Sequence, residues 1–235
     1  MIDKLMLEQG VNELNLAISG AQIDTFDSLA ELLIECNESV NLTSILTPSR
    51  ILTEHFLDSI TCLTVIEPPG KGTILDIGTG AGFPGLPIAI MFPDLECILM
   101  DSTQKKLNFI DNVCEILNIS NVTTLHARAE TAAHDKNLRE KFDIVYARAV
   151  GEMKVLSELC LPFVAIDGYF IAQKSMDYEI ELEKGKSMIG NLGGKVSRIY
   201  TKKIPFTEIK RTLIVMEKIK STPKDFPRHY SKIKS

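Results

Sequence analysis

The sequence lacks several features that define membrane proteins and disulfide-stabilised proteins. It contains no run of 18 consecutive apolar residues, so we expect no membrane-spanning helix. The first ten residues lack the apolar core of a secretory signal peptide. The five cysteines include no C-x-x-C pair, and no cluster of His, Cys, Asp and Glu has the spacing of metal ligands. We therefore expect a cytoplasmic protein with reduced cysteines, no metal site and no contact with a membrane.

The composition is that of an ordinary globular protein, but its charge is unevenly distributed. The 235 residues are 45% hydrophobic and 24% charged, with a net charge of −5. Residues 195–235 contain twelve Lys and Arg against three Asp and Glu, so this part carries +9 and the remaining residues carry −14. A basic end on an acidic body favours an anionic partner, although a solvated, lysine-rich edge strand explains the same charges.

Residues 73–101 contain the most informative pattern. Residues 73–77 form a short apolar run, and three alternating glycines and two prolines follow it: Gly78, Gly80, Gly82, Pro84 and Pro87. The prolines fit the first turn of a helix that continues to residue 92. A second apolar run, residues 95–100, ends at Asp101. The order of strand, glycine loop, helix, strand and acid predicts one βαβ unit of a nucleotide-binding sheet.

Two ligands compete for this motif. Residues 80–85 match G-x-G-x-x-G, the dinucleotide pattern, and Asp101 follows near the expected spacing. Residues 76–82 match D-x-G-x-G-x-G, the longer motif of class I S-adenosylmethionine (SAM) methyltransferases. We favour SAM, because a pyrophosphate site needs a helix that opens without prolines in its turn. Gly78 and Gly80 would let the ligand approach the backbone, and Asp101 would accept hydrogen bonds from both ribose hydroxyls. A bare glycine turn is the structural alternative.

The other segments continue the alternation of helices and strands. Helices are predicted over residues 24–40, 49–65, 104–118, 152–164 and 178–189, and strands over 122–126, 142–146, 168–173, 196–200 and 212–216. We therefore predict an α/β, Rossmann-like class I methyltransferase fold, with a doubly wound, mostly parallel sheet of about seven strands and a C-terminal antiparallel hairpin. The expected domains are a dependent helical cap (1–67), a SAM-binding domain (68–220) and a basic tail (221–235).

Several short stretches, in order along most of the chain, also resemble one family. The strongest is Asp76-Ile-Gly-Thr-Gly-Ala-Gly-Phe-Pro-Gly-Leu-Pro87. The others are Asn41-Leu-Thr-Ser-Ile45, His55-Phe-Leu-Asp-Ser59, Asp101-Ser102 with Lys105-Lys106, Asn121-Val122, Arg128-Ala-Glu130, Ala147-Arg-Ala-Val150 and Phe226-Pro-Arg228. Together they resemble the bacterial small-subunit ribosomal RNA methyltransferase G family, also called glucose-inhibited division protein B.

The resemblance implies an activity and a set of ligand contacts. The activity is transfer of the SAM methyl group to N7 of one guanine in the decoding-region loop of 16S ribosomal RNA. The substrate is expected to be the RNA itself, the small subunit or an assembly intermediate, and the protein is expected to be a monomer. The implied contacts are Gly78 and Phe83 in the glycine loop, Ala129 and Glu130 beside the adenine, and Arg148 near the methionine end or the target. Phe83 as core, Glu130 as a helix-start acid and Arg148 as a surface ion pair are the structural alternatives. We favour ligand roles, because an arginine between two alanines at a strand tip should have few neighbours to cover it.

No catalytic residue is predicted. The Asn/Asp-Pro-Pro-Tyr/Phe pattern of amine methylation is missing after the fourth strand, and guanine N7 carries no proton to remove. Catalysis is then a matter of positioning. His55 and Asp58 are expected to form a structural pair, and the tail from residue 224 onward is expected to contact RNA without affecting SAM binding. A catalytically idle SAM- or ribosome-binding module and an NAD-dependent oxidoreductase are the alternative functions.

Overall fold

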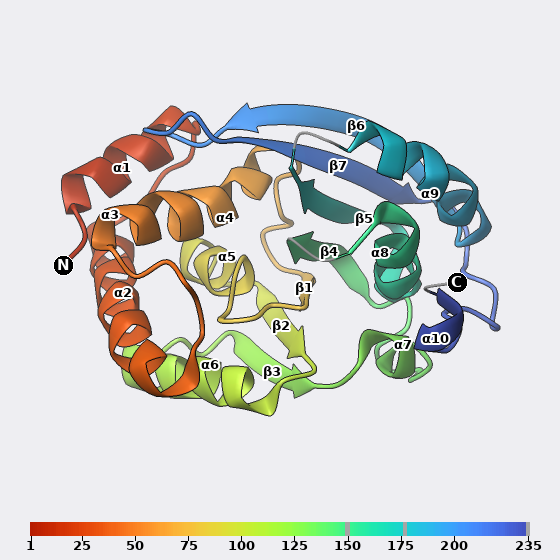
Figure 1. Cartoon of the computed structure of the whole chain (residues 1–235), viewed down its shortest axis with the longest axis horizontal. Helices are drawn as coiled ribbons and strands as arrows, with labels where there is room; N and C mark the ends of the chain where they lie inside the picture. Colours follow the sequence, from red (N-terminus) through yellow and green to blue (C-terminus); the bar gives the residue numbers. More distant parts are fainter. Residues whose placement is uncertain (149–150, 176–177, 234–235) are drawn as a thin grey trace.

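Seven strands form a single sheet in the order β3-β2-β1-β4-β5-β7-β6 (Figure 1). The computed structural model describes residues 1–148, 151–175 and 178–233. The strands are β1 (Thr73–Ile77), β2 (Glu96–Asp101), β3 (Val122–His126), β4 (Phe142–Arg148), β5 (Val164–Lys174), β6 (Gly194–Lys203) and β7 (Lys210–Lys218). Strands β1 to β5 are parallel to one another, and β7 lies between β5 and β6, antiparallel to both. The predicted sheet with its antiparallel hairpin is therefore confirmed.

Helices cover both faces of this sheet (Figure 1). One side carries α1 (Lys4–Glu13), α2 (Gly20–Val40), α3 (Pro48–Arg50), α4 (Asp58–Ile60), α5 (Gly85–Met91) and α6 (Gln104–Leu117). The other side carries α7 (Ala129–Ala132), α8 (Met153–Cys160), α9 (Glu179–Asn191) and α10 (Tyr230–Ile233). No helix among the described residues is both long and apolar enough to cross a membrane.

The strand side chains alternate between two apolar clusters because successive residues of a strand point to opposite faces. On β1, Ile74 joins the cluster beneath α2 and α5, and Leu75 joins the cluster beneath α8. On β4, Tyr146 and Ala147 divide in the same way. The first cluster also contains the buried residues of α1 and α2, so the N-terminal helices share their core with the sheet.

Local hydrogen bonds fix the N-terminal helices on the sheet. Ser19 and Gln22 form a capping box at the start of α2, which therefore begins four residues before the predicted Asp24. The Gln22 side-chain amide also donates to the carbonyl oxygens of Ile90 and Met91 at the end of α5, at 2.8 and 3.1 Å. One residue thus starts a helix and holds it against the βαβ unit.

Two predicted helices were wrong in their detail. Residues 48–64 are not one regular α-helix, because a π-helical segment, η1 (Ile51–Leu57), separates α3 from α4, and a 3₁₀ turn, η2 (Thr61–Thr64), follows. The helix predicted over 152–164 ends at Cys160. Pro162 then lies in a 3₁₀ turn, η3 (Leu161–Phe163), and β5 begins directly at Val164.

Candidate active site

The glycine loop after β1 has a backbone that only glycine adopts without strain. Gly78, Gly80 and Gly82 have φ angles of 71°, 62° and 93°. A Cβ at Gly82 would collide with the Leu86 side chain, whereas one at Gly80 would meet no atom within 4 Å. Leu86 therefore fills the space beside Gly82, whereas the loop surface is open at Gly80.

A buried carboxylate holds this loop from beneath. Asp76 is fully buried, and its Oδ2 accepts hydrogen bonds from the Thr79 hydroxyl at 2.6 Å and from the Gly85 backbone N–H at 2.8 Å. Its Oδ1 has no hydrogen-bond partner, and burial raises the pKa of the carboxyl to about 6. The acid of the glycine motif thus joins the end of β1 to the start of α5, and it does not face the open side of the loop.

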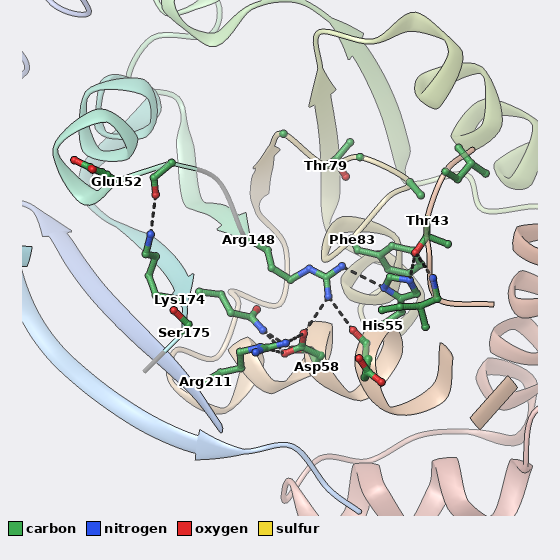
Figure 2. Close-up of a pocket in the computed structure, with 18 residues that line it drawn as sticks. Thr43, His55, Asp58, Thr79, Phe83, Arg148, Glu152, Lys174, Ser175 and Arg211 are labelled. Atoms are coloured by element: carbon green, nitrogen blue, oxygen red, sulfur yellow. Dashed lines mark hydrogen bonds and ion pairs between the residues drawn. The ribbon is translucent and has the colours of Figure 1, made fainter. Parts of the chain in front are cut away.

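Two cavities meet at Gly78, the one residue that lines both of those described here. The smaller cavity, of about 150 Å³, lies over the ends of β1, β2 and β3. The larger cavity, of about 750 Å³, lies between the glycine loop, η1 and the ends of β4 and β5 (Figure 2). Both open at the carboxyl edge of the parallel strands, where this class of sheet binds its ligands.

The smaller cavity contains three of the predicted contacts: Asp101, Ala129 and Glu130. Asp101 is 9% exposed, and each carboxylate oxygen already accepts a backbone hydrogen bond. Oδ2 accepts from the Gly80 N–H at 3.0 Å, and Oδ1 accepts from the Thr103 N–H at 2.8 Å. Because each oxygen keeps a second lone pair, the carboxylate both fixes the glycine loop and remains an acceptor toward the cavity.

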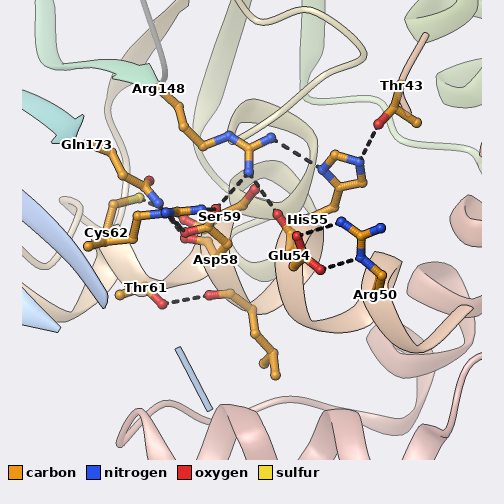
Figure 3. A network of polar contacts seen from close by, with 12 residues as sticks. Thr43, Arg50, Glu54, His55, Asp58, Ser59, Thr61, Cys62, Arg148 and Gln173 are labelled. Carbon is orange, nitrogen blue, oxygen red and sulfur yellow. Dashed lines mark hydrogen bonds and ion pairs between the residues drawn. The ribbon is translucent and has the colours of Figure 1, made fainter. Parts of the chain in front are cut away.

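The floor of the larger cavity is one buried carboxylate between two guanidinium groups (Figure 3). The side chain of Asp58 is 2% exposed. Arg211 donates from Nε and Nη2 to its two oxygens at 3.0 and 3.1 Å, and Arg148 donates from Nη1 at 3.1 Å. The Gln173 amide adds a hydrogen bond to Oδ1. This group of three side chains carries one net positive charge, and its guanidinium N–H groups can donate to an electron-rich ligand.

Arg148 also contacts an aromatic pair beside the glycine loop. Its Nη2 lies 3.4 Å from His55 Nδ1, and its guanidinium carbon lies 5.5 Å from the Phe83 ring centroid. The His55 and Phe83 rings stack at 4.4 Å with an interplanar angle of 4°. The other imidazole nitrogen, Nε2, lies 2.9 Å from Thr43 Oγ1. Burial and the neighbouring Arg148 charge lower the pKa of His55 to about 4, so it is neutral at pH 7.

These contacts change several expectations. Arg148 was expected to have few neighbours, but η1 covers its side chain, which is only 15% exposed. Phe83 is 4% exposed, so it is part of the core as well as of the cavity wall. His55 and Asp58 share Arg148 as a partner, and no hydrogen bond between the two is among the described contacts. Ala149 and Val150 of the quoted motif lie outside the described residues.

The structure brings the predicted residues to the same cleft. Gly78, Gly80, Phe83 and Arg148 line the larger cavity, and Gly78, Asp101, Ala129 and Glu130 line the smaller one. Sequence reasoning missed Gln173, Lys174, Arg211 and Tyr230, which also line the two cavities. Arg211 stands on β7, and nothing in its local sequence places it beside η1. For the described residues, no group of three or more His, Cys, Asp and Glu has a geometry that could hold a metal ion.

Comparison with known proteins gives matches along most of the chain. The model of the rRNA small subunit methyltransferase G family matches residues 22–213. Proteins named ribosomal RNA small subunit methyltransferase G from Desulforamulus reducens and from Bacillus subtilis are each 43% identical to it. The first match covers 95% of this chain and 93% of the relative, and the second covers 93% and 92%.

Solved structures with low sequence identity share the fold. Precorrin-6y C5,15-methyltransferase from Geobacter metallireducens has a TM-score of 0.52 at 16% identity, over 77% of this chain and 96% of its own. TYW2 from M. jannaschii, in complex with AdoMet, has a TM-score of 0.51 at 15% identity, over 86% and 78%. At these identities the similarity concerns the arrangement of helices and strands alone.

Proposed function

This chain belongs to the rRNA small subunit methyltransferase G family, and we propose that it transfers a methyl group from SAM to N7 of one guanine in the decoding-region loop of 16S ribosomal RNA. It has the class I methyltransferase fold, and its cofactor is SAM. The choice of guanine N7 rests on the activity that the sequence motifs imply and on the chemistry of the larger cavity.

The observation that carries the proposal is the meeting of two cavities at Gly78. This residue lies at the carboxyl edge of the sheet, where the strand order reverses between β1 and β4. The residues present fit SAM, because the loop surface is open at Gly80 and an acid follows β2. When bound, SAM supplies a methyl group on a positively charged sulfur, which is already a strong electrophile.

We assign the smaller cavity to the adenosine half of SAM. Asp101 would accept hydrogen bonds from the ribose, and Ala129 and Glu130 would lie beside the adenine. Gly78 borders both cavities and would lie beside the centre of the molecule. Phe83 and Arg148, in the larger cavity, would then hold the methionine end and the target base.

The side chains of the larger cavity are suited to positioning a base and poorly suited to removing a proton. The Asp58 carboxylate is held by two guanidinium groups, and His55 Nδ1 faces the Arg148 guanidinium at 3.4 Å. The Glu54 carboxylate forms an ion pair with Arg50 at 2.5 Å. Guanine N7 has an exposed lone pair and no proton, so a base held in line with the methyl group needs only orientation. A guanine displaced from its RNA stack would meet guanidinium donors that suit its O6 or a phosphate.

Ligand binding and RNA mapping test this function against its alternatives. We expect isothermal titration to detect SAM and S-adenosylhomocysteine but not NAD. Mass mapping of 16S RNA from cells with and without the gene should show one methylated guanine that depends on the gene. NAD binding without SAM binding would establish an oxidoreductase. SAM binding without any gene-dependent methylation would establish a catalytically idle module.

The mechanism is tested by single-turnover methylation. The rate should be nearly flat between pH 7 and pH 8, because no proton is removed and neither His55, with a pKa of about 4, nor Asp76, with a pKa of about 6, changes charge much in this range. Arg148→Ala should lower the rate by about 100-fold through loss of orientation. Arg198→Ala, which removes an exposed arginine on β6 outside both cavities, is the matched control and should keep the rate. A steep rise with pH that one carboxyl variant abolishes would show a general base.

The proposal also includes a monomer in the cytoplasm that acts on 16S RNA, on the small subunit or on an assembly intermediate. The five free cysteines, three of them buried, support a reducing compartment. Sedimentation tests the monomer, and methylation of naked RNA against purified particles separates the substrates.

A further inference from the structure

The C-terminal segment, residues 219–233, is held to the body by buried polar contacts. Glu158 on α8 is fully buried, and its carboxylate accepts hydrogen bonds from the Arg228 backbone N–H, Nε and Nη2 at 2.8, 2.9 and 2.7 Å. The Arg139 guanidinium donates to four carbonyl oxygens, three of them in this segment: Ala133, Thr222, Pro223 and Phe226. The segment expected to be a basic tail for RNA therefore uses Arg228 to bind the protein itself.

These contacts bring α10 to the smaller cavity. Figure 1 shows α10 beside α7 and below α8. Tyr230, the first residue of α10, lines the smaller cavity together with Ala129, Glu130 and Leu159. Ile233, at the other end of α10, is 1% exposed and packs into the core cluster beneath α8. The helix is thus anchored at its far end, with Tyr230 at the cavity.

We propose that Tyr230 contacts the adenosine half of SAM and that the Glu158–Arg228 pair is a positioning device for it. The inference rests on the assignment of the smaller cavity to adenosine. Among the described residues that line this cavity, Tyr230 is the one aromatic side chain, and the other walls are Ile77, Gly78, Met100, Asp101, Ser102, the residues 127–130 and Leu159. An aromatic ring offers a purine both apolar area and a favourable ring-to-ring contact.

Tyr230 follows Asp101 by 129 positions in the sequence, and the anchoring residues explain how it reaches the same cavity. Leu159 lines the cavity, and its neighbour Glu158 binds Arg228, two residues before Tyr230. One turn of α8 therefore supplies part of the cavity wall and the anchor of α10. Removal of the segment from residue 224 onward should lower SAM affinity, contrary to the expectation from the sequence.

Replacement of Tyr230 tests the contact. Tyr230→Ala should raise the Kd of SAM by about tenfold. 5′-Methylthioadenosine, which keeps the adenosine half and lacks the amino acid, should lose affinity by the same factor. The KM for SAM should rise, while kcat and the Kd for RNA stay unchanged. Tyr178→Ala is the matched control, because Tyr178 packs on the same cluster but does not line the cavity.

The outcomes separate the inference from the proposed function. Unchanged affinity in Tyr230→Ala, with normal SAM binding by the natural protein, would overturn the contact and leave the function standing. Equal losses of affinity in Tyr230→Ala and Tyr178→Ala would show that Tyr230 only packs on the cluster and does not contact SAM. A natural protein that binds neither SAM nor 5′-methylthioadenosine would overturn the function itself.

A double-mutant cycle tests the positioning role. Arg228→Ala should weaken SAM binding in the natural background but add nothing when Tyr230 is already Ala, because it acts only through Tyr230. Arg228→Lys should restore part of the affinity. Additive losses in the double variant would show that Arg228 stabilises the fold without positioning Tyr230.

Discussion

The two cavities on either side of Gly78 are built in different ways. The smaller one is formed mainly by the ends of β1, β2 and β3, three neighbouring parallel strands. The larger one collects residues from segments far apart in the chain, among them Thr43, Asp58, Arg148 and Arg211. The first is lined mostly by residues at or just after the strand ends, together with Leu159 and Tyr230, whereas the second presents two guanidinium groups around one carboxylate. The half that we assign to adenosine thus depends mainly on the sheet, and the half that we assign to the target base depends on tertiary packing.

This difference explains which site residues could be predicted from the sequence and which could not. Asp101 could be predicted from its place at the end of the second strand, because the carboxyl ends of parallel strands meet at one edge of a sheet. Ala129 and Glu130 were implied by the family resemblance, and the structure places them beside Asp101 at that edge. Arg211 was not found, because its place depends on β7 entering the sheet between β5 and β6. Tyr230 was not found either, because its position depends on the buried Glu158 carboxylate rather than on any local pattern. The burial of Phe83 follows from its stacking on His55, which the loop sequence does not encode.

Asp58→Ala is expected to have the largest effect on stability, and it changes the larger cavity without changing the smaller one. It leaves two partly buried guanidinium groups without a counter-charge. The free energy of unfolding should fall by about 3–5 kcal/mol, measured by urea denaturation. Asp58→Asn should lose less, because the amide keeps a carbonyl acceptor. The exposed Asp94→Ala should change nothing, and a loss equal to that of Asp58→Ala would contradict the special role of this carboxylate.

A pH series tests the charge state of His55, which lines the larger cavity. The pKa of His55 is about 4 in the fold and 6.5 when unfolded, so the unfolded chain takes up the proton first. Its contribution to stability is therefore present above pH 6.5 and is lost as the pH falls toward 4. Asp76, with a pKa raised from 3.8 to about 6, opposes this by losing stability as the pH rises over the same window.

His55→Asn removes the first of these two opposing contributions. The difference in free energy of unfolding between the natural protein and this variant should shrink by about 2–3 kcal/mol from pH 7 to pH 4.5. Thr123→Asn, which replaces an exposed residue of β3 that does not titrate, is the control, and its difference should not change with pH. A constant difference for His55→Asn as well would show that His55 is not held in its neutral form.

Asp101→Ala addresses the smaller cavity alone. It removes an acceptor for the ribose and frees the Gly80 N–H, so SAM affinity should fall by about 1.5–3 kcal/mol, roughly 10- to 150-fold in Kd by titration calorimetry. RNA binding should be unchanged, since the residues of the larger cavity are intact. Asp111→Ala, which removes an exposed carboxylate on α6, serves as the matched control. Unchanged SAM affinity in Asp101→Ala would exclude Asp101 from the site.

The smallest expected effect concerns RNA contact beyond the larger cavity. Of the basic residues on β6 and β7, Lys202 lies directly opposite Arg211 in the hairpin, so the two side chains share one face of the sheet, whereas Lys195 is exposed at the opposite end of the same strand pair. Arg211 lines the larger cavity, so an RNA whose base enters there should pass its backbone near Lys202. Lys202→Ala should lower the slope of log affinity against log salt by about 0.7–0.9, the value for one lost phosphate contact. Lys195→Ala should leave the slope unchanged, and SAM affinity should be the same in both variants. Equal slopes for the natural protein and Lys202→Ala would mean that the lysines of this hairpin are solvated and that RNA approaches the larger cavity from another side.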